Sequence, residues 1–507
     1  MLAKTTSGGV EGIRPYPVYV EVDLSAGLQA FDLVGLPEAA VRESRVRVRS
    51  ALRNAGFEFP NRRTTVNLAP ADVPKGGSRY DLPIAMGILA ASGQVSKSGL
   101  SDSVFLAELS LDGELRPVRG VLPVAVLAQE MGAKRLFVAP GNRAEASVVS
   151  GVEVIGVRSL LSLVAILQGE EPEIMADECV RPVKDVPSPD MCDVVGQKEA
   201  KRAILVAAAG GHNLLLVGPP GCGKSMLARR IPGILPALTE TEALTVGLIQ
   251  SVSGKVDGGS GCRSRPFRAP HHTATIPALV GGGVPVMPGE VSLAHHGVLF
   301  LDELPEFKRG VLESLRQPVE DGSVTLARAQ AHVTFPSEVM LVGAMNPCPC
   351  GWSGHPVREC SCGWEASQRY MSRVSGPLLD RMDIQFEVPS VPSAELYAAE
   401  RPGSSEQLRE QICAARARQF ERAGGRARWN TAVPAEELLQ SGDVSASAVR
   451  LLRRWVDRGG MSARAHARVL RVARSIADLA DRSAVSEEDV FEALSYRALD
   501  EIHGASS

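Results

Sequence analysis

The chain has 507 residues, with 55 Lys and Arg against 58 Asp and Glu and a formal net charge of −3. This balance excludes a strongly basic protein that would bind nucleic acid through its overall charge alone. The length predicts about three domains with ample cores. Aromatic residues make up only 4% of the sequence, so base stacking is not expected to dominate any nucleic-acid contact.

Residues 1–168 are predicted to form an α/β domain. Strand-like runs at 18–22, 66–68 and 136–139 alternate with helical patterns at 38–55, 82–91 and 121–131. The first fifteen residues lack the apolar core of a secretory signal. The longest uncharged run, 203–223, is interrupted by Gly, His and Pro, which argues against a membrane span. We therefore expect a cytoplasmic protein without a membrane partner.

A nucleotide-binding domain is predicted over 193–389, after an acidic, Pro-containing linker at 169–192. The apolar run Leu214–Val217 leads directly into a G-x-x-x-x-G-K-S loop. Glycines allow the backbone amides of such a loop to surround phosphate, and Lys224 reaches the β- and γ-phosphates. The apolar residues of segment 193–197, just over twenty residues before the phosphate loop, are predicted to pack on adenine. The predicted nucleotide-binding residues are Val195, Gly196, Gly218, Pro219, Pro220, Gly221, Cys222, Gly223, Lys224, Ser225 and Met226.

Catalytic side chains are predicted at the ends of two further buried strands. The run 298–301 ends in Asp302 and Glu303, and the run 340–345 ends in Asn346. In this arrangement Asp302 and Ser225 hold Mg²⁺, and Glu303 polarises the attacking water. Asn346 is expected beside the γ-phosphate. Together with the phosphate loop, these residues predict ATP hydrolysis.

Four cysteines form two C-x-C-G pairs, Cys348 with Cys350 and Cys360 with Cys362. Four thiolates favour a closed tetrahedral Zn²⁺ site, and we predict structural zinc here. Free or redox-active thiols are the alternative, and His355 is a possible substitute ligand. The pairs at 271–272 and 295–296 are expected to pack near the nucleotide rather than to bind metal.

A hairpin is predicted around Arg328, because alternating runs at 323–326 and 331–335 flank it. Beyond a second linker, residues 390–507 are predicted to be helical, with an arginine-rich block at 409–474. Such a block suits a phosphate backbone or a neighbouring subunit, whereas a solvated helical surface is the plainer alternative.

The order of motifs resembles AAA+ ATPases of the Mg-chelatase-like group. The segments that carry the likeness are 267–273, 281–283, 288–290, 293–297 and 312–322. With the N-terminal domain included, nearly the whole chain is similar to the YifB/ComM-type family. The resemblance implies a fold of three parts: a Lon-protease-like α/β domain, a P-loop NTPase core with a parallel sheet, and a helical C-terminal domain.

The resemblance also implies a hexameric ring with ATP between subunits. Residues 376–383 match the family segment that donates an arginine to the neighbouring site, which makes Arg381 the candidate and Arg373 the alternative. A plainer interpretation pairs Arg381 with Asp380 or Asp383. Residues 461–464 resemble the second sensor motif, which would place Arg464 over the nucleotide. In similar ATPases the hairpin projects into the pore, where Arg328 would meet DNA phosphates.

The N-terminal domain resembles Lon-type proteases at 69–77 and 111–120. A Ser–Lys dyad needs a lysine shortly after the second segment, but residues 121–124 read Val-Leu-Pro-Val. Ser78 therefore has no base, and the domain is expected to be an inactive scaffold.

Taken together, the resemblance implies an ATP-driven DNA motor of the helicase or branch-migration type. It would act on single-stranded or branched recombination intermediates, with possible recombination-protein partners, during integration of transforming DNA. Two alternatives stay open: the motor subunit of a metal chelatase, and an ATP-driven protein remodeller or protease.

Overall fold

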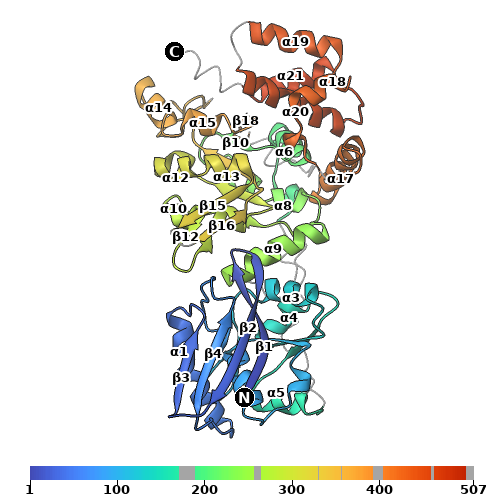
Figure 1. Ribbon diagram of the computed structural model, residues 1–507. Coiled ribbons are helices and arrows are strands. Elements are labelled where there is room, and N and C mark those ends of the chain that lie inside the picture. Colours follow the sequence, from blue (N-terminus) through green and yellow to red (C-terminus); the bar gives the residue numbers. More distant parts are fainter. Residues whose placement is uncertain are drawn as a thin grey trace.

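The computed structural model describes residues 1–170, 189–255, 264–328, 331–355, 357–391, 403–426, 428–457 and 462–497. Within these ranges the chain forms three stacked parts: an N-terminal sheet domain, a central sheet domain and a helical C-terminal part (Figure 1). The predicted α/β multidomain fold is thus confirmed. The predicted linker at 169–192 lies mostly outside the described residues.

The N-terminal domain contains a seven-stranded mixed sheet in the order β3-β4-β2-β1-β5-β8-β9. Strands β1, β2 and β4 pair antiparallel, whereas the β3–β4, β1–β5, β5–β8 and β8–β9 pairs are parallel. The strands are β1 (Leu2–Glu11), β2 (Arg14–Ser25), β3 (Ala30–Val34), β4 (Arg63–Ala69), β5 (Ser103–Leu106), β8 (Arg135–Val138) and β9 (Glu153–Gly156). A small separate pair is made by β6 (Glu108–Leu109) and β7 (Leu115–Arg116).

Five helices pack on this sheet, and the first three lie where the sequence predicted them. They are α1 (Ala39–Asn54), α2 (Asp81–Ala91), α3 (Val121–Glu130), α4 (Pro140–Ala146) and α5 (Leu160–Leu167). Every residue of α2 is buried, so this helix forms the centre of the domain's core. Alternate residues of β2 are buried, as expected for a strand with one face on the core.

The central domain contains five parallel strands in the order β11-β14-β17-β10-β18. They are β11 (Phe267–Arg268), β14 (Val298–Leu301), β17 (Met340–Met345), β10 (Leu214–Val217) and β18 (Ile384–Glu387). Every residue of β10, β14 and β17 is buried, because helices cover both faces of a parallel sheet. Parallel strands end at one edge, so the chain segments that follow β10, β14 and β17 meet there.

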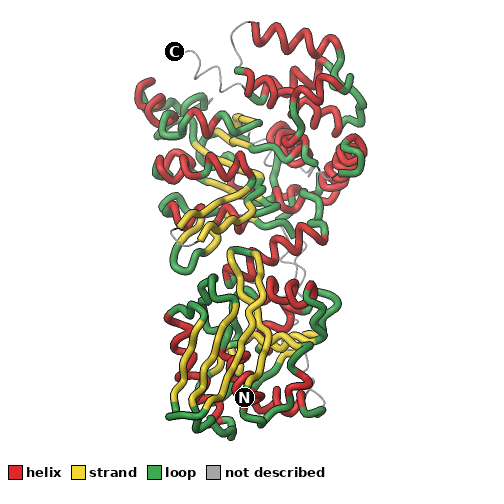
Figure 2. The backbone as a smooth tube through the Cα atoms, in the orientation of Figure 1, coloured by secondary structure: helices red, strands yellow, loops and turns green. Residues whose placement is uncertain are grey.

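The helices of this domain are α6 (Lys198–Gly210), α7 (Lys224–Ala228), α8 (Ile231–Ile234), α9 (Glu240–Ser253), α10 (Ile276–Val280), α11 (Glu290–Leu293), α12 (Arg309–Ser314), α13 (Arg316–Asp321), α14 (Trp364–Met371) and α15 (Gly376–Leu379). Two hairpins join β12 (Gly281–Gly282) to β13 (Met287–Pro288) and β15 (Ser323–Arg328) to β16 (Ala331–Pro336). The tube in Figure 2 shows how short most of these helices are.

The C-terminal part is helical, as predicted. Its helices are α17 (Ser405–Arg422), α18 (Ala435–Gln440), α19 (Ala446–Asp457), α20 (Ala463–Leu479) and α21 (Glu487–Ser495). Helix α20 contacts α21, α17 and α6, so it joins this part to the central domain. None of the helices in the described ranges combines the length and apolar character that crossing a membrane requires.

Helix α9 of the central domain packs on the N-terminal domain. Its Leu244 and Leu248 pack against the apolar cluster around α3. At its C-terminal end, the carbonyl of Ser251 accepts from the amide of Gly120 at 3.0 Å. The hydroxyl of Ser251 accepts from the amide of Leu122 at 3.2 Å. Two amides at the start of α3 thus have a partner in the neighbouring domain, and the amide of Leu122 also donates to Oε1 of Glu145 at 3.3 Å.

The turn between β1 and β2 makes a second contact with the central domain. A Cβ placed on Gly12 would lie 2.8 Å from Cγ1 of Val333 in β16. Gly12 also has a φ of +61°, a conformation that suits glycine. The tip of the β1–β2 hairpin therefore touches the β15–β16 hairpin.

Candidate nucleotide site

The phosphate loop connects β10 to α7. Gly221 and Gly223 have φ values of +80° and +97°, which explains the need for glycine at both positions. The ammonium of Lys224 donates to the carbonyls of Gly218 at 2.6 Å and Pro219 at 2.9 Å. Burial lowers the pKa of Lys224 from its ordinary value. The lysine is therefore held inside the loop that would surround a phosphate.

The two residues predicted to hold Mg²⁺ are brought together. The hydroxyl of Ser225 donates to Oδ2 of Asp302 at 2.6 Å, although the two residues are separated by 77 positions. The amide of Glu303 donates to the other carboxylate oxygen of Asp302 at 3.0 Å. A hydroxyl and a carboxylate oxygen side by side are ligands that Mg²⁺ prefers, so the donor set fits this ion.

Asn346 and Glu303 complete the group at the carboxyl edge of the sheet. Oδ1 of Asn346 accepts from the ammonium of Lys224 at 3.2 Å. The side chain of Glu303 is 60% exposed, and its Oε2 lies 3.3 Å from Nδ1 of His272. Residues that follow β10, β14 and β17 thus lie close together at the carboxyl edge of the sheet. The carboxylate of Glu303 is exposed to solvent.

The predicted adenine segment lies beside the phosphate loop. The side-chain amide of Gln197, next to Val195 and Gly196, donates to the carbonyls of Cys222 at 3.1 Å and Pro389 at 2.6 Å. Met226, just after Ser225, is 39% exposed at the start of α7.

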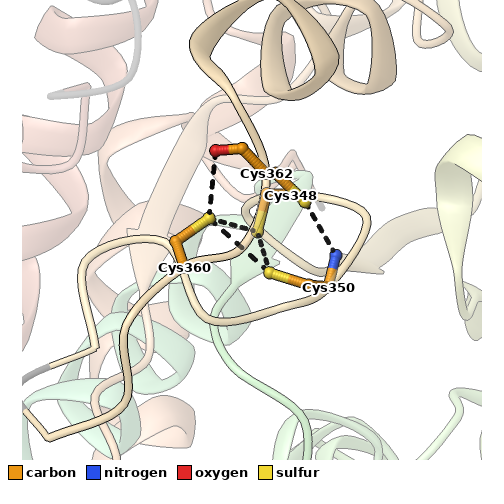
Figure 3. Close-up of side chains that lie close together, drawn as sticks. All are labelled: Cys348, Cys350, Cys360 and Cys362. Carbon is orange, nitrogen blue, oxygen red and sulfur yellow. Dashed lines mark hydrogen bonds between the residues drawn. The ribbon is translucent and has the colours of Figure 1, made fainter.

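The four predicted zinc ligands form one cluster (Figure 3). The sulfurs of Cys348 and Cys350 lie 3.4 Å apart, and each lies 3.6 Å from the sulfur of Cys360. The amide of Cys350 donates to the sulfur of Cys362 at 3.4 Å. Tetrahedral zinc with bonds of about 2.3 Å requires sulfurs roughly 3.8 Å apart, and the four sulfurs lie within 4.8 Å of one another, so the donor set fits Zn²⁺. The thiolates would form the structural core of this loop around the ion.

The loop that carries the cysteine cluster touches the phosphate loop. A Cβ on Gly351 would lie 2.5 Å from Cδ of Pro220 and 3.8 Å from Cγ of Asn346. Gly351 has a φ of +83°, so glycine serves both the turn and the close approach. The shape of the cysteine cluster therefore bears directly on the shape of the phosphate loop.

The histidine pairs behave differently from each other. Burial lowers the pKa of His295 to about 3, and its Nδ1 accepts from the amide of Glu338 at 3.0 Å. Among the described residues, the cysteine cluster is the one group of three or more side chains placed to hold a metal ion. Neither histidine pair therefore has a third potential metal ligand beside it in the described structure. His272 contacts Glu303, and sequence reasoning missed this contact. The strand before it, β11, has only two residues, so the sequence carries little signal for the position of His272.

Arg381 and Arg464 lie at the opposite edge of the sheet from the phosphate loop. They line one pocket with Asn213, Gly297 and Asp383, which directly precede β10, β14 and β18. The structure does not bring Arg464 over the nucleotide site of its own chain, which corrects the expectation of a contact within one subunit. Helix α20 reaches the amino ends of the strands instead: its Arg468 lies 3.5 Å from Asp383.

The ion pairs of the two candidate arginines differ from the sequence-based expectation. Arg381 pairs with Glu320, and its NH1 donates to the carbonyl of Pro377 at 2.7 Å. Glu320 thus takes the place of the expected Asp380 or Asp383. Arg373 pairs with Glu306 at 3.3 Å on the surface. Arg328 belongs to β15 and pairs with Ala331 in register, but its side chain lies outside the described residues.

The N-terminal domain has no lysine bonded to Ser78 in the described structure. The hydroxyl of Ser78 donates to the carboxylate of Glu108. Lys75 is fully buried, and its ammonium has no hydrogen-bond partner in the described part of the chain. Leu122 and Val124 are buried where a base would be needed.

Comparisons with known proteins agree along the whole chain. Residues 190–396 match the family described as "Magnesium chelatase, subunit ChlI", and residues 402–497 match "Magnesium chelatase, subunit ChlI C-terminal". Residues 20–142 match "Subunit ChlI of Mg-chelatase".

Among relatives, the chain is 45% identical to "Competence protein ComM" of Haemophilus influenzae over 504 residues, covering 98% of each chain. It is 43% identical to YifB of Escherichia coli over 496 residues, covering 97% of this chain and 96% of that one. The "Magnesium-chelatase 67 kDa subunit" of Chlorobaculum parvum is 28% identical over 159 residues, 31% of this chain and 23% of that one. The chain therefore belongs to the YifB/ComM family of Mg-chelatase-like AAA+ proteins.

Proposed function

We propose that this protein is an ATP-hydrolysing DNA motor that works as a homo-hexameric ring. The observation that carries ATP hydrolysis is the convergence of Lys224, Ser225, Asp302 and Asn346 at one sheet edge, with Glu303 beside them. The family membership supports the same activity. The motor would act as a helicase or in branch migration.

Each residue has a distinct task in the proposed reaction. Lys224 exchanges its contacts with the loop carbonyls for the β- and γ-phosphates. Asp302 and Ser225 would hold Mg²⁺, which would neutralise phosphate charge when bound. Glu303 orients the attacking water and accepts its proton, while Asn346 fixes the geometry beside the γ-phosphate.

A ring would explain why Arg381 and Arg464 lie at the sheet edge opposite the phosphate loop. In a head-to-tail ring, the amino edge of one sheet meets the carboxyl edge of the next subunit's sheet. Arg381 and Arg464 would then reach the neighbour's γ-phosphate. Two buried groups in this pocket, Nε of Arg381 and NH1 of Arg468, have no hydrogen-bond partner among the described residues, as expected before an anion arrives.

DNA is the proposed polymer substrate, and the β15–β16 hairpin with Arg328 is its proposed contact. The relative named "Competence protein ComM" supports a role in competence. We therefore place the protein in the cytoplasm, at recombination intermediates that form when transforming DNA is integrated, where recombination proteins would be its partners.

The test is the ATPase rate with single-stranded, duplex, forked and four-way-junction DNA at low and moderate salt. We expect several-fold stimulation by single-stranded or branched DNA that weakens with salt and disappears in Arg328→Ala. Arg369→Ala, an exposed arginine on α14, is the matched control and should keep the stimulation. No stimulation by any DNA would favour a chelatase-type or protein-remodelling motor.

A further inference from the structure

Helix α1, on the outside of the N-terminal domain (Figure 1), carries a row of arginines. Four of them follow one another at intervals of three and four residues and so share one side of the helix: Arg42, Arg45, Arg49 and Arg53. We call these four residues the arginine stripe. Arg49 is half-buried and the other three are exposed. The buried side of the helix packs into the domain core at Val41, Ser44, Val48, Ala51 and Leu52.

The guanidinium groups of the arginine stripe have no carboxylate partner among the described residues. The one acid of α1 is Glu43, and its Oε2 lies 3.7 Å from NH1 of Arg47 on another side of the helix. Nε of Arg47 also lies 2.6 Å from Oδ2 of Asp81. The charge of Arg47 is therefore balanced within the protein, whereas the four charges of the stripe are not.

Neutral contacts orient the arginines of the stripe. Nε of Arg42 donates to the carbonyl of Pro37 at 3.1 Å, and Nε of Arg45 donates to the carbonyl of Arg42 at 3.2 Å. The guanidinium of Arg49 lies 4.8 Å from the ring centre of Phe59, and its Nε has no hydrogen-bond partner in the described part of the chain. Such contacts limit side-chain freedom without neutralising the charge, which lowers the entropy cost of binding an anion.

The dimensions of the stripe fit a DNA backbone. From Arg42 to Arg53 the helix is about 16 Å long at a rise of about 1.5 Å per residue. One strand of a duplex has a phosphate about every 3.4 Å along the axis, so the stripe spans about five phosphates. Arginines without a base-reading partner suit phosphate contacts that ignore sequence. A lipid surface fits less well, because the apolar side of α1 is buried in the core and is not free to insert among acyl chains.

The arginine stripe starts near the junction between the N-terminal and central domains. A Cβ on Gly76 would lie 2.5 Å from Oε2 of Glu38, the residue before α1. Three residues after Gly76, NH1 of Arg79 lies 3.5 Å from the place of a Cβ on Gly120. The amide of Gly120 in turn donates to Ser251 of α9. A duplex arm that leaves the central domain at this junction would meet the stripe.

We propose that the arginine stripe is a second DNA-binding surface, which holds a duplex arm of a branched substrate against the N-terminal domain. The proposal deepens the function given above and rests on it for DNA as the substrate. It gives the N-terminal domain a binding task that needs neither a serine nucleophile nor a lysine base. The stripe anchors DNA and takes no part in hydrolysis.

The test is the Kd for a labelled four-way junction, measured by fluorescence anisotropy at several salt concentrations. The double variant Arg45→Gln/Arg53→Gln should raise the Kd at least about tenfold at roughly 0.1 M salt, and should lower the slope of log K against log salt by about 1.8. Its ATPase rate without DNA should not change. Lys134→Gln/Arg158→Gln is the matched control, because it removes two exposed cations of the same domain that already have carboxylate partners. This control should bind the junction as the wild type does.

An unchanged Kd and salt slope in a folded Arg45→Gln/Arg53→Gln protein would overturn the proposal. An equal loss of binding in the control variant would do so as well, because any surface cation of the domain would then serve. If the double variant keeps DNA binding but loses binding to phosphatidylserine vesicles, the stripe is a membrane contact and the proposal fails.

The variant Arg328→Ala separates this proposal from the proposed motor. It should lose the stimulation of ATPase by DNA and keep the junction binding that the stripe provides. If the wild-type protein binds junctions through the stripe but shows no stimulation, the motor fails and the stripe stands. If the double variant binds normally while stimulation persists, the motor stands and the stripe fails.

Discussion

At the scale of single residues, the hydrolytic site shows how far sequence reasoning reaches. The contact between Ser225 and Asp302 could be predicted, because a loop and a carboxylate that follow parallel strands must meet at one edge. The contact between His272 and Glu303 could not be predicted, since β11 is only two residues long and three residues separate it from His272. Short edge strands leave a weak pattern in the sequence.

Replacing Glu303 by Gln should leave ATP bound but not hydrolysed. The amide keeps the size of the side chain and cannot accept the water proton. We expect the single-turnover rate to fall at least about 100-fold, the usual scale for loss of a general base. The Kd for ATP, measured with a fluorescent analogue, should hold within twofold or so. Glu306→Gln, one turn onward and paired with Arg373, should hydrolyse ATP normally; a similar loss there would remove the special role of Glu303.

His295 should make the protein sensitive to mild acid. The pKa of His295 is about 3 in the folded protein, below the ordinary value of 6.5. Between these two pH values the unfolded chain binds a proton that the folded protein does not. Stability present above pH 6.5 is therefore lost as pH falls toward 3, by about 1.4 kcal/mol for each pH unit. His295→Asn keeps an acceptor for the amide of Glu338. Urea unfolding at pH 7.5 and 5.5 should show a smaller loss in this variant, and equal losses would contradict the assignment.

At the scale of elements, the buried strands were predictable and the positions of the last helices were not. Runs such as Val298–Leu301 are wholly buried, and their uninterrupted apolar sequence indicates this directly. The place of α20 depends instead on how α17, α21 and α6 pack around it. A local motif around Arg464 therefore could not reveal which edge of the sheet the arginine reaches.

The cysteine cluster should couple metal content to nucleotide binding. Cys348→Ser removes one of four ligands, and we expect about one Zn²⁺ per chain to be lost by elemental analysis. Because Gly351 packs on Pro220, ATP affinity should fall in the same variant, by roughly 10- to 100-fold. Cys413→Ser changes an exposed cysteine on α17 and should alter neither quantity. If a zinc-free variant binds ATP normally, the cysteine cluster does not influence the phosphate loop.

At the scale of the whole molecule, the phosphate loop and the two candidate arginines lie at opposite edges of the central sheet. The phosphate loop lies at the carboxyl edge, whereas Arg381 and Arg464 lie at the amino edge. Within the described part of the chain, Arg381 and Arg464 therefore lie away from the phosphate loop of their own subunit. This division is the reason to expect activity only in an assembled ring.

Mixing two inactive variants tests that division. Lys224→Ala loses its own site but keeps Arg381, and Arg381→Ala keeps its phosphate loop. Each variant alone should be inactive. In an equal mixture whose subunits enter a closed ring at random, about a quarter of the interfaces combine an intact phosphate loop with an intact Arg381 and should regain activity. Two affinity tags would verify that mixed rings form. If the ATPase activity of such mixed rings does not exceed that of either variant, Arg381 acts elsewhere.

The docking of α9 has a consequence for anyone who wishes to divide this protein. Leu244 and Leu248 belong by sequence to the central domain and by packing to the N-terminal core. Cutting the chain at the linker would strip the cover from both leucines and leave the first amides of α3 without Ser251. We expect a shortened protein to bury this exposed apolar surface by self-association. Its apparent oligomeric size would then result from the truncation and not from ring assembly.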